Sequence, residues 1–245
     1  MPLYLWVNLA VLLPPLLLSF DRRVNFVGLW RSFWPANLIT LAGFVAWDVA
    51  FTKMGVWGFN PDYLIGVNLA GLPIEEWLFF ITVPYACTFT YVTLRTYIRR
   101  DLLEDYAPAL TFLAWLICLG LVAHFDGRLY TQWAAGLTAA GLTWALIQTP
   151  VWGGRFWAAY AVLLVPFVVS NGVLTGIEFW HHPFLNWDAA SISDQIVFYH
   201  PAHNTGLRIF TMPADDLVYG FLLIAMNIGL MEHFENRRRL RSLTN

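Results

Sequence analysis

Two short motifs place paired carboxylates at the start of apolar stretches. The sequences PIEEWLFF and PADDLVYG each begin with proline and carry two adjacent acids, Glu75 and Glu76 in the first and Asp215 and Asp216 in the second. Proline suits the first turn of a helix, so each pair is expected in the first turn of a helix that starts at the proline. A third acid, Asp48, lies inside another apolar stretch. Acids in such surroundings usually mark function, and the chemistry they offer is proton transfer and stabilisation of a cation.

A simpler explanation is that first-turn acids only complement the helix dipole. Two copies in one chain, together with Asp48, favour a functional site instead. Aromatic residues make up 17% of the chain and several accompany the acids. Interfacial belts of Trp and Tyr account for some of them in membrane proteins, but aromatic faces also stabilise cations. The residues expected to line such a site are Trp47, Trp57, Phe79, Phe80 and Tyr219.

The composition is that of a membrane protein. The 245 residues are 58% hydrophobic and 12% charged, with a mean hydropathy of +0.57, which differs from soluble domains. A net charge of -2 and a pI near 6.3 do not predict nucleic-acid binding, which needs a basic patch. We predict an all-α polytopic protein, because seven stretches are long enough to cross a core of ~30 Å: about 2–20, 33–52, 73–97, 106–124, 129–147, 155–175 and 213–234.

The distribution of Lys and Arg predicts the orientation, because these residues concentrate in cytoplasmic loops. With the N-terminus outside, the outer loops hold three of the 14 basic residues: Lys53, Arg128 and Arg208. The inner side holds the other eleven: Arg22, Arg23, Arg31, Arg95, Arg99, Arg100, Arg155, Arg237, Arg238, Arg239 and Arg241. We therefore predict a multi-pass protein of the cell membrane, with the N-terminus outside and the C-terminus inside.

The acidic motifs also indicate an internal repeat. Upstream of them, VAWDVAFT matches VVSNGVLT, which places Asp48 over Asn171. Three helices in each half and one linking helix make the halves parallel, so that both acidic motifs lie at the same membrane face. Repeats of this kind often place a site between the halves. We predict a first repeat at 1–100, a linking helix at 101–128 and a second repeat at 129–245.

No cofactor or metal site is indicated. The histidines of the second long loop match no strong pattern such as HExxH, and neither GxGxxG nor GxxxxGK[ST] occurs. The sequence therefore predicts no metal, and it indicates neither a flavin nor a nicotinamide as a redox cofactor.

One further pattern suggests a family. The run WDVAFTKMGVWGFNPDYL, followed by LPIEEWLFFITVPYACTF, resembles the small membrane-embedded lycopene cyclases that lack a flavin fingerprint, in their fused two-domain form. The second half departs from the pattern, because Asp215 and Asp216 replace glutamates and Asn171 replaces the counterpart of Asp48. The resemblance implies closure of linear carotenoid end groups into ionone-type rings, with the β ring favoured, by acid-initiated carbocation cyclisation without net redox.

The resemblance also implies partners and roles. The partners would be a hydrophobic, lycopene-like carotenoid, membrane lipid and other carotenoid enzymes. The residues implied in catalysis are, in order of preference, Glu75 and Glu76, then Asp215, Asp216 and Asp48. Lys53 and Asn60 would have an orienting role. The residues alone leave open which acid of each pair faces the cavity and which is anchored by Asn171, Arg208 or backbone amides.

Two other functions stay open at this point. An intramembrane prenyltransferase would handle similar isoprenoids, but adjacent acid pairs lack the spacing expected for binding magnesium and diphosphate. A proton-linked transporter would also use buried acids. Ring type, forty- or fifty-carbon substrate, one ring or two, and oligomeric state are not determined by these residues.

Overall fold

The computed structural model describes residues 1–244, and Asn245, the last residue of the predicted second repeat, lies outside the described part. Over residues 1–244 the chain forms seven α-helices, joined by 3-10 turns and short strands. Each helix coincides with one predicted apolar stretch, so the all-α prediction is confirmed. The helices are α1 (Leu3–Leu18), α2 (Trp30–Lys53), α3 (Ile74–Tyr97), α4 (Ala107–His124), α5 (Leu129–Gln148), α6 (Gly153–Thr175) and α7 (Asp215–Thr244).

Length and composition divide these helices into two groups. Within the described chain, five segments are long and apolar enough to cross a membrane: Phe26–Lys53, Ile74–Tyr97, Ala107–His124, Gly153–Thr175 and Asp215–Leu243. Helix α1 is apolar but has only 16 residues. Helix α5 is rich in alanine, glycine and threonine and is not among the five. Apolar helices satisfy their own backbone hydrogen bonds, which is what a bilayer requires of a spanning segment.

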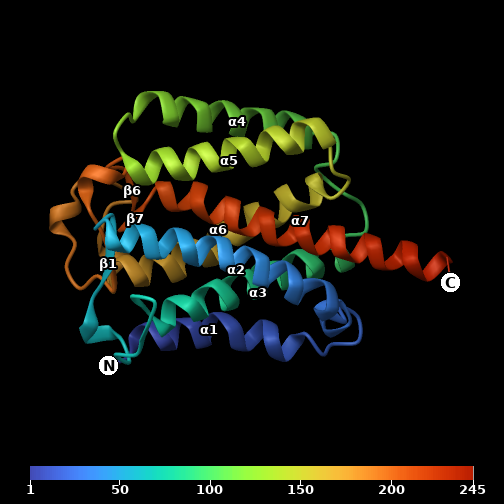
Figure 1. The fold of residues 1–245 in the computed structure, drawn as a ribbon, viewed down its shortest axis with the longest axis horizontal. Helices are drawn as coiled ribbons and strands as arrows, with labels where there is room; N and C mark the ends of the chain where they lie inside the picture. Colours follow the sequence, from blue (N-terminus) through green and yellow to red (C-terminus); the bar gives the residue numbers. More distant parts are fainter. Residues whose placement is uncertain (245) are drawn as a thin grey trace.

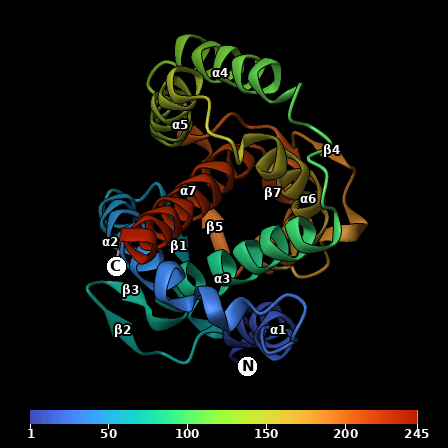
Figure 2. The ribbon, with the colours of Figure 1, turned by 90° about the vertical axis from the view of Figure 1, so that its right-hand side faces the viewer.

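The helices form a bundle with the two chain ends at opposite ends of it (Figure 1). Helix α1 packs on α3, α2 packs on α7, and α5 contacts both α7 and α4. Helix α4 therefore lies on the outside, as the end-on view shows (Figure 2). Part of the core is aromatic, because the ring of Phe26 meets those of Phe33, Tyr85 and Phe89 edge to face at centroid distances of 5.6, 5.2 and 5.8 Å.

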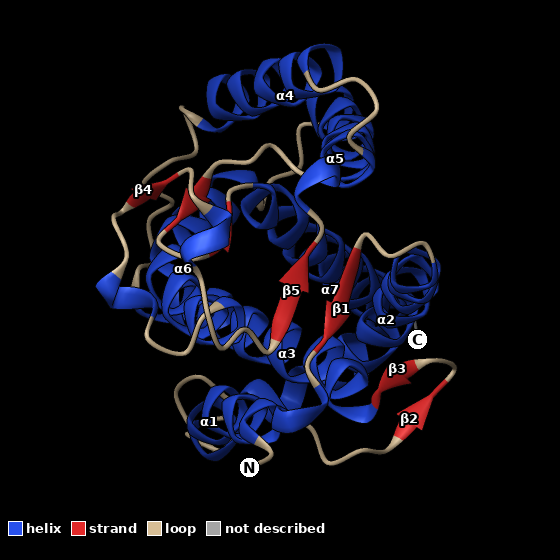
Figure 3. Cartoon of the chain, turned by 90° about the vertical axis from the view of Figure 1, so that its left-hand side faces the viewer, coloured by secondary structure: helices blue, strands red, loops and turns tan. Residues whose placement is uncertain are grey.

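Short strands cover the end of the bundle that carries the N-terminus (Figure 3). Strand β1 (Trp57–Phe59) pairs antiparallel with β5 (Val197–Tyr199). One more backbone hydrogen bond extends the pair at each end, donated by the amides of Asn60 (2.8 Å) and His200 (2.9 Å). The pairing is the same when the two strands are exchanged, so it has a local twofold symmetry.

A hairpin comes before each acidic helix. Before α3, β2 (Asn68–Leu69) pairs with β3 (Leu72–Pro73); before α7, β6 (Arg208–Ile209) pairs with β7 (Met212–Pro213) and with β4 (Leu185–Asn186). Each hairpin follows a three-residue 3-10 turn, Pro61–Tyr63 or Pro201–His203. The two acidic helices are thus entered through segments of the same local structure.

The helix starts differ slightly from the prediction. Helix α3 begins at Ile74 and α7 at Asp215, so Pro73 and Pro213 lie in the preceding strands and not in the first helical turns. Pro73 has a ψ of 146°, which is extended, and proline is tolerated at the edge of a sheet because it has no N–H to leave unpaired. Both acid pairs still lie in the first turn of their helices.

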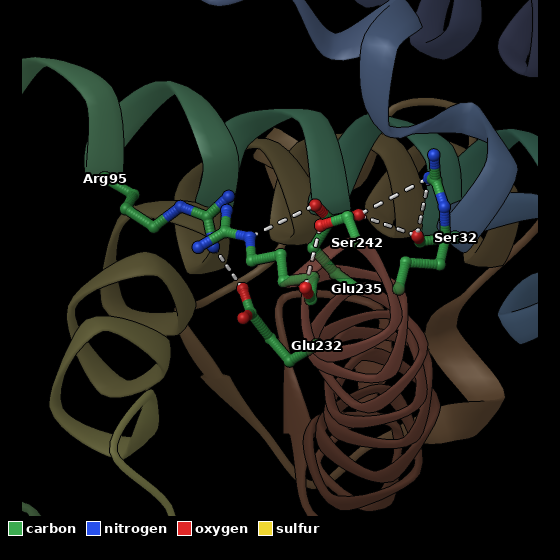
Figure 4. Close-up of polar contacts among 7 residues, drawn as sticks. Ser32, Arg95, Glu232, Glu235 and Ser242 are labelled. Atoms are coloured by element: carbon green, nitrogen blue, oxygen red, sulfur yellow. Dashed lines mark hydrogen bonds and ion pairs between the residues drawn. The ribbon is translucent and has the colours of Figure 1, made fainter. Parts of the chain in front are cut away.

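At the opposite end of the bundle, polar contacts link α7 to α2 and α3 (Figure 4). Glu232 of α7 forms an ion pair with Arg95 of α3 and accepts a hydrogen bond from the hydroxyl of Tyr91 at 3.0 Å. Glu235 accepts a hydrogen bond from Ser32 of α2 at 2.8 Å. These contacts hold α2, α3 and α7 in a fixed relation, and the acids discussed next lie on the same three helices.

Candidate functional site

A cavity lies between the helices near the strand-covered end of the bundle. The space between its lining atoms amounts to about 610 Å³, including the part that is open to solvent, and it is lined from every helix except α4, and from β1 and β5. Three carboxyl groups face it, Asp48 from α2, Glu76 from α3 and Asp216 from α7. Among the residues described, none of its lining side chains is Lys, Arg or His. The fold therefore brings three acids from distant parts of the chain to one cavity that no basic side chain lines.

Asp48 and Glu76 form one acidic group. Oδ1 of Asp48 accepts hydrogen bonds from Nε1 of Trp57 (2.5 Å) and Oγ1 of Thr52 (3.2 Å), and the hydroxyl of Tyr4 donates to Oε2 of Glu76. Both acids line the cavity, and Oδ2 of Asp48 is buried without a hydrogen-bond partner among the described residues. Two carboxyl groups that face one buried cavity are more easily accommodated when one of them is protonated, so this arrangement suits a neutral acid beside a carboxylate.

Asp216 has different surroundings, because three donors surround it. Its Oδ1 accepts a hydrogen bond from the hydroxyl of Tyr130 at 2.5 Å. Its Oδ2 accepts one from Nδ2 of Asn171 at 2.7 Å and one from the hydroxyl of Tyr199 at 3.1 Å. Desolvation and the charge of Asp216 raise the pKa of Tyr199 well above its usual value, so this hydroxyl keeps its proton and can donate. Three donors suit an ionised carboxylate, which only accepts.

The first acid of each pair points elsewhere. Oε1 of Glu75 accepts the backbone amide of Ile65 at 2.6 Å. In the same way Asp215 accepts the backbone amide of Thr205 at 3.1 Å, ten residues upstream, and also binds the hydroxyls of Thr205 (2.7 Å) and Thr131 (2.5 Å). Neither first acid lines the cavity. Adjacent helical residues point about 100° apart, so one acid orders the preceding loop while the next faces the cavity.

Aromatic rings enclose the acids. The ring of Tyr130 lies 5.1 Å from that of Trp57, 5.7 Å from Tyr199 and 6.0 Å from Tyr219, measured between centroids. All four residues line the cavity, as does Phe79. Aromatic faces carry negative electrostatic potential, so this lining suits a positively charged intermediate without offering it a nucleophile stronger than water.

Four other predicted residues lie outside the lining. The ring of Trp47 stands behind it, 5.0 Å from that of Tyr219, and Phe80 is buried in the same cluster. Lys53 is exposed at the end of α2, and Asn60 caps the 3-10 turn after β1. The structure therefore places Lys53 and Asn60 away from the acids, whereas Asn171 binds Asp216 directly.

Several cavity residues were not predicted from the sequence. Tyr4 and Tyr130 lie in the first turns of α1 and α5 and donate to acids on other helices. Tyr199 comes from β5, and Phe167 comes from the middle of α6. A hydroxyl-bearing residue in the first turn of an apolar helix was the available signal for the two helical tyrosines. Tyr199 gave none, because only the pairing of β5 with β1 brings it to the site.

Over residues 1–244, no group of three His, Cys, Asp or Glu side chains is placed to hold a metal ion. In the second long loop, the side chain of His200 instead accepts the backbone amide of Ala202 at 3.2 Å and so caps a 3-10 turn.

The fold and the cavity define a class of protein, an apolar helical bundle with carboxyl groups inside an aromatic chamber. A comparison with protein families then identifies the family. The profile described as lycopene cyclase matches residues 1–94 and 127–234, which is most of the chain. The chain belongs to the lycopene cyclase family.

Curated relatives agree with this assignment. The chain is similar to proteins named bifunctional lycopene cyclase/phytoene synthase from Podospora anserina, with 31% identity over 88 residues, and from Aspergillus oryzae, with 25% identity over 154 residues. These matches cover 36% and 60% of the chain but only 14% and 23% of the relatives, which are much longer proteins. No solved structure matches the chain.

Proposed function

We propose that this chain closes the acyclic end groups of a linear carotenoid, such as lycopene, into ionone-type rings, with the β ring as the expected product. The observation that carries the proposal is the cavity itself, in which Asp48, Glu76 and Asp216 share one aromatic lining that has no basic side chain. Membership of the lycopene cyclase family supports the substrate class. An apolar cavity of this kind suits a hydrocarbon.

Glu76 is the proposed general acid. The Asp48 and Glu76 pair has no cation beside it, so the two groups are most stable with one proton between them. A carboxylic acid held neutral in an apolar site can protonate the terminal double bond of the end group. The π electrons of that bond take the proton, and a tertiary cation results. The aromatic rings around the pair stabilise the charge.

Asp216 is the proposed base. The cation is attacked by the next double bond, whose π electrons form the new ring bond and leave a second tertiary cation. Asp216, ionised by its three donors, attracts this cation and takes a ring proton, and the C–H electrons become the ring double bond. One proton enters and one leaves, so the product is an isomer of the substrate. We therefore propose activity without flavin or nicotinamide as a redox partner.

We also propose that the chain consists of two related halves, residues 1–100 and 129–245, with a linking helix at 101–128. Three observations support this. The segments before α3 and α7 have the same order of turn and hairpin, the β1–β5 pairing has local twofold symmetry, and the family profile leaves out 95–126. Co-expression of 1–100 and 101–245 as separate chains should restore ring formation, and inactivity of that pair beside an active intact chain would count against the division.

The proposed topology is seven membrane passes with the N-terminus outside. This orientation puts eleven basic residues on the inner side and three on the outer side, as expected when Lys and Arg concentrate in cytoplasmic loops. Both native cysteines are buried, so a cysteine introduced at Asp62 or near Arg239 can be labelled over a low background. Label from outside should reach position 62 and not position 239 in intact cells, and labelling of both from the same side would refute the topology.

The activity is tested by expressing the chain in cells that accumulate lycopene and analysing the pigments. Ring-containing carotenoid should appear only with the active chain. In heavy water each new ring should carry one solvent-derived deuterium, at the carbon that received the proton. Unchanged lycopene in the presence of folded, membrane-inserted protein would contradict the proposed function.

A further inference from the structure

The cavity has a polar end and an apolar end. On α7 its lining residues are Asp216, Tyr219, Gly220, Leu223 and Ile224, which is the spacing of one helix face. From Asp216 to Ile224 this face extends about 12 Å along the axis, at about 1.5 Å per residue. The cavity therefore runs along the helices from the acids toward the middle of the bundle.

Helices α3 and α6 show the same polarity. On α3 the lining continues from Glu76 to Val83, and on α6 it runs from Leu174 and Asn171 at the acidic end to Phe167. The deep end is thus formed by apolar side chains. Val83, Leu223 and Ile224 are buried there, whereas Phe167 is partly exposed. Phe167 is accordingly the lining side chain that separates the deep end from the outside of the bundle.

Side chains close the seam between α6 and α7 at this level. The hydroxyl of Tyr160 on α6 donates to the carbonyl of Leu217 on α7 at 2.7 Å. The ring of Phe167 lies so close to Gly220 that a Cβ atom added there would be 3.0 Å from its Cζ. Pro166, directly before Phe167 inside α6, lacks the N–H that would bond the preceding turn.

We propose that the seam between α6 and α7 is the path by which the linear chain of the substrate leaves the cavity toward lipid, with Phe167 over Gly220 as its constriction. This inference rests on the proposed function. A carotenoid with one end group at the acids is longer than the cavity, so its polyene must pass out of the protein. At the apolar end, Phe167 of α6 is partly exposed, and Val165 and Val169 of the same helix are 71% and 50% exposed on the surface that would face lipid.

The test narrows the constriction by one methyl group. In Gly220→Ala the new Cβ forces the Phe167 ring outward into the path of the chain. The matched control is Gly229→Ala, on the same helix, where a Cβ would lie 3.1 Å from the ring of Trp152 but away from the cavity. Two substrates are compared in membranes, lycopene and a truncated linear carotenoid that keeps one acyclic end group but ends before the level of Gly220, which is four residues or about 6 Å from Asp216 along α7. Retention of lycopene on the purified protein, read from its visible absorption, is measured in parallel.

Gly220→Ala should lower lycopene turnover and retention by about tenfold, as expected for about 1.4 kcal/mol of overpacking. It should leave turnover of the truncated carotenoid close to that of the wild type. Removing the ring as well, in Phe167→Ala with Gly220→Ala, should restore lycopene turnover, since the two changes act on one contact. Gly229→Ala should behave as the wild type with both substrates.

Two results would overturn the inference. Equal behaviour of Gly220→Ala and Gly229→Ala would show that the chain does not pass this seam. Equal loss with lycopene and the truncated carotenoid would show that Gly220→Ala disturbs the acidic end instead. A wild-type protein that retains lycopene but forms no ring would contradict the proposed function, and the retention measurements would still decide whether the seam holds the chain.

Discussion

Replacing each acid of the first motif by its amide separates catalysis from loop anchoring. In Glu76→Gln the side chain keeps its size, and its carbonyl oxygen can still accept the hydrogen bond from Tyr4. What is lost is the proton that the pair with Asp48 carries. Loss of a positioned general acid costs about 10²–10⁴ in rate, which corresponds to about 3–5 kcal/mol in the barrier. Product formation should therefore almost stop while the fold is kept.

Glu75→Gln is the matched control, because it makes the same chemical change one residue away. Oε1 of Glu75 accepts the amide of Ile65 at 2.6 Å, and the carbonyl oxygen of glutamine can accept it as well. Only the added strength of a charged acceptor is lost, about 1 kcal/mol. The rate should fall by less than about tenfold, through a less ordered loop before α3.

Both variants are assayed by pigment analysis with preformed, unlabelled lycopene in isolated membranes suspended in heavy water, and protein levels and melting temperatures are measured in detergent. The expected result is a melting temperature close to wild type for Glu76→Gln with almost no ring, and rings with one deuterium each for Glu75→Gln. A larger loss of product in Glu75→Gln than in Glu76→Gln would refute the assignment. So would rings that form in heavy water without deuterium.

Three further predictions follow from the same contacts. Asp216→Asn should lower the rate of ring formation by a factor of about 10²–10⁴ through loss of the base. Asp215→Asn changes only a loop contact and should lower the rate by less than about tenfold. The ratio of ring-containing carotenoid to lycopene measures both effects. Gly172→Ala should lower the free energy of unfolding by about 1–3 kcal/mol through overpacking, and with it the melting temperature, because its Cβ would lie 2.7 Å from the buried ring of Phe179. An unchanged melting temperature would refute this packing. Glu232→Gln should also lower the free energy of unfolding by about 1–3 kcal/mol, but leave the deuterium content of any ring at one, since this ion pair lies away from the cavity.

The sequence alone predicted where the helices lie and which acids belong to the site. Each helix is an apolar stretch of 16 to 30 residues, and this property is local to a short part of the chain. The predicted stretch 129–147 became α5, which has 20 residues but is not among the five segments that are long and apolar enough to cross a membrane. The starts of α3 and α7 were misplaced by one or two residues, because the pairing of Pro73 and Pro213 in hairpins depends on strands that the sequence did not indicate.

Only the tertiary structure shows which acid of each pair faces the cavity and which binds the preceding loop. Glu75 and Glu76 have the same chemistry and the same neighbours in sequence, and only helix packing turns the second toward the cavity and the first toward Ile65. The donors to Asp216 illustrate the same limit, because Tyr130 and Tyr199 lie 86 and 17 residues away along the chain. Sequence determines which groups can exchange a proton, but their electrostatic surroundings depend on distances of a few ångströms, and those are set only when distant segments pack together.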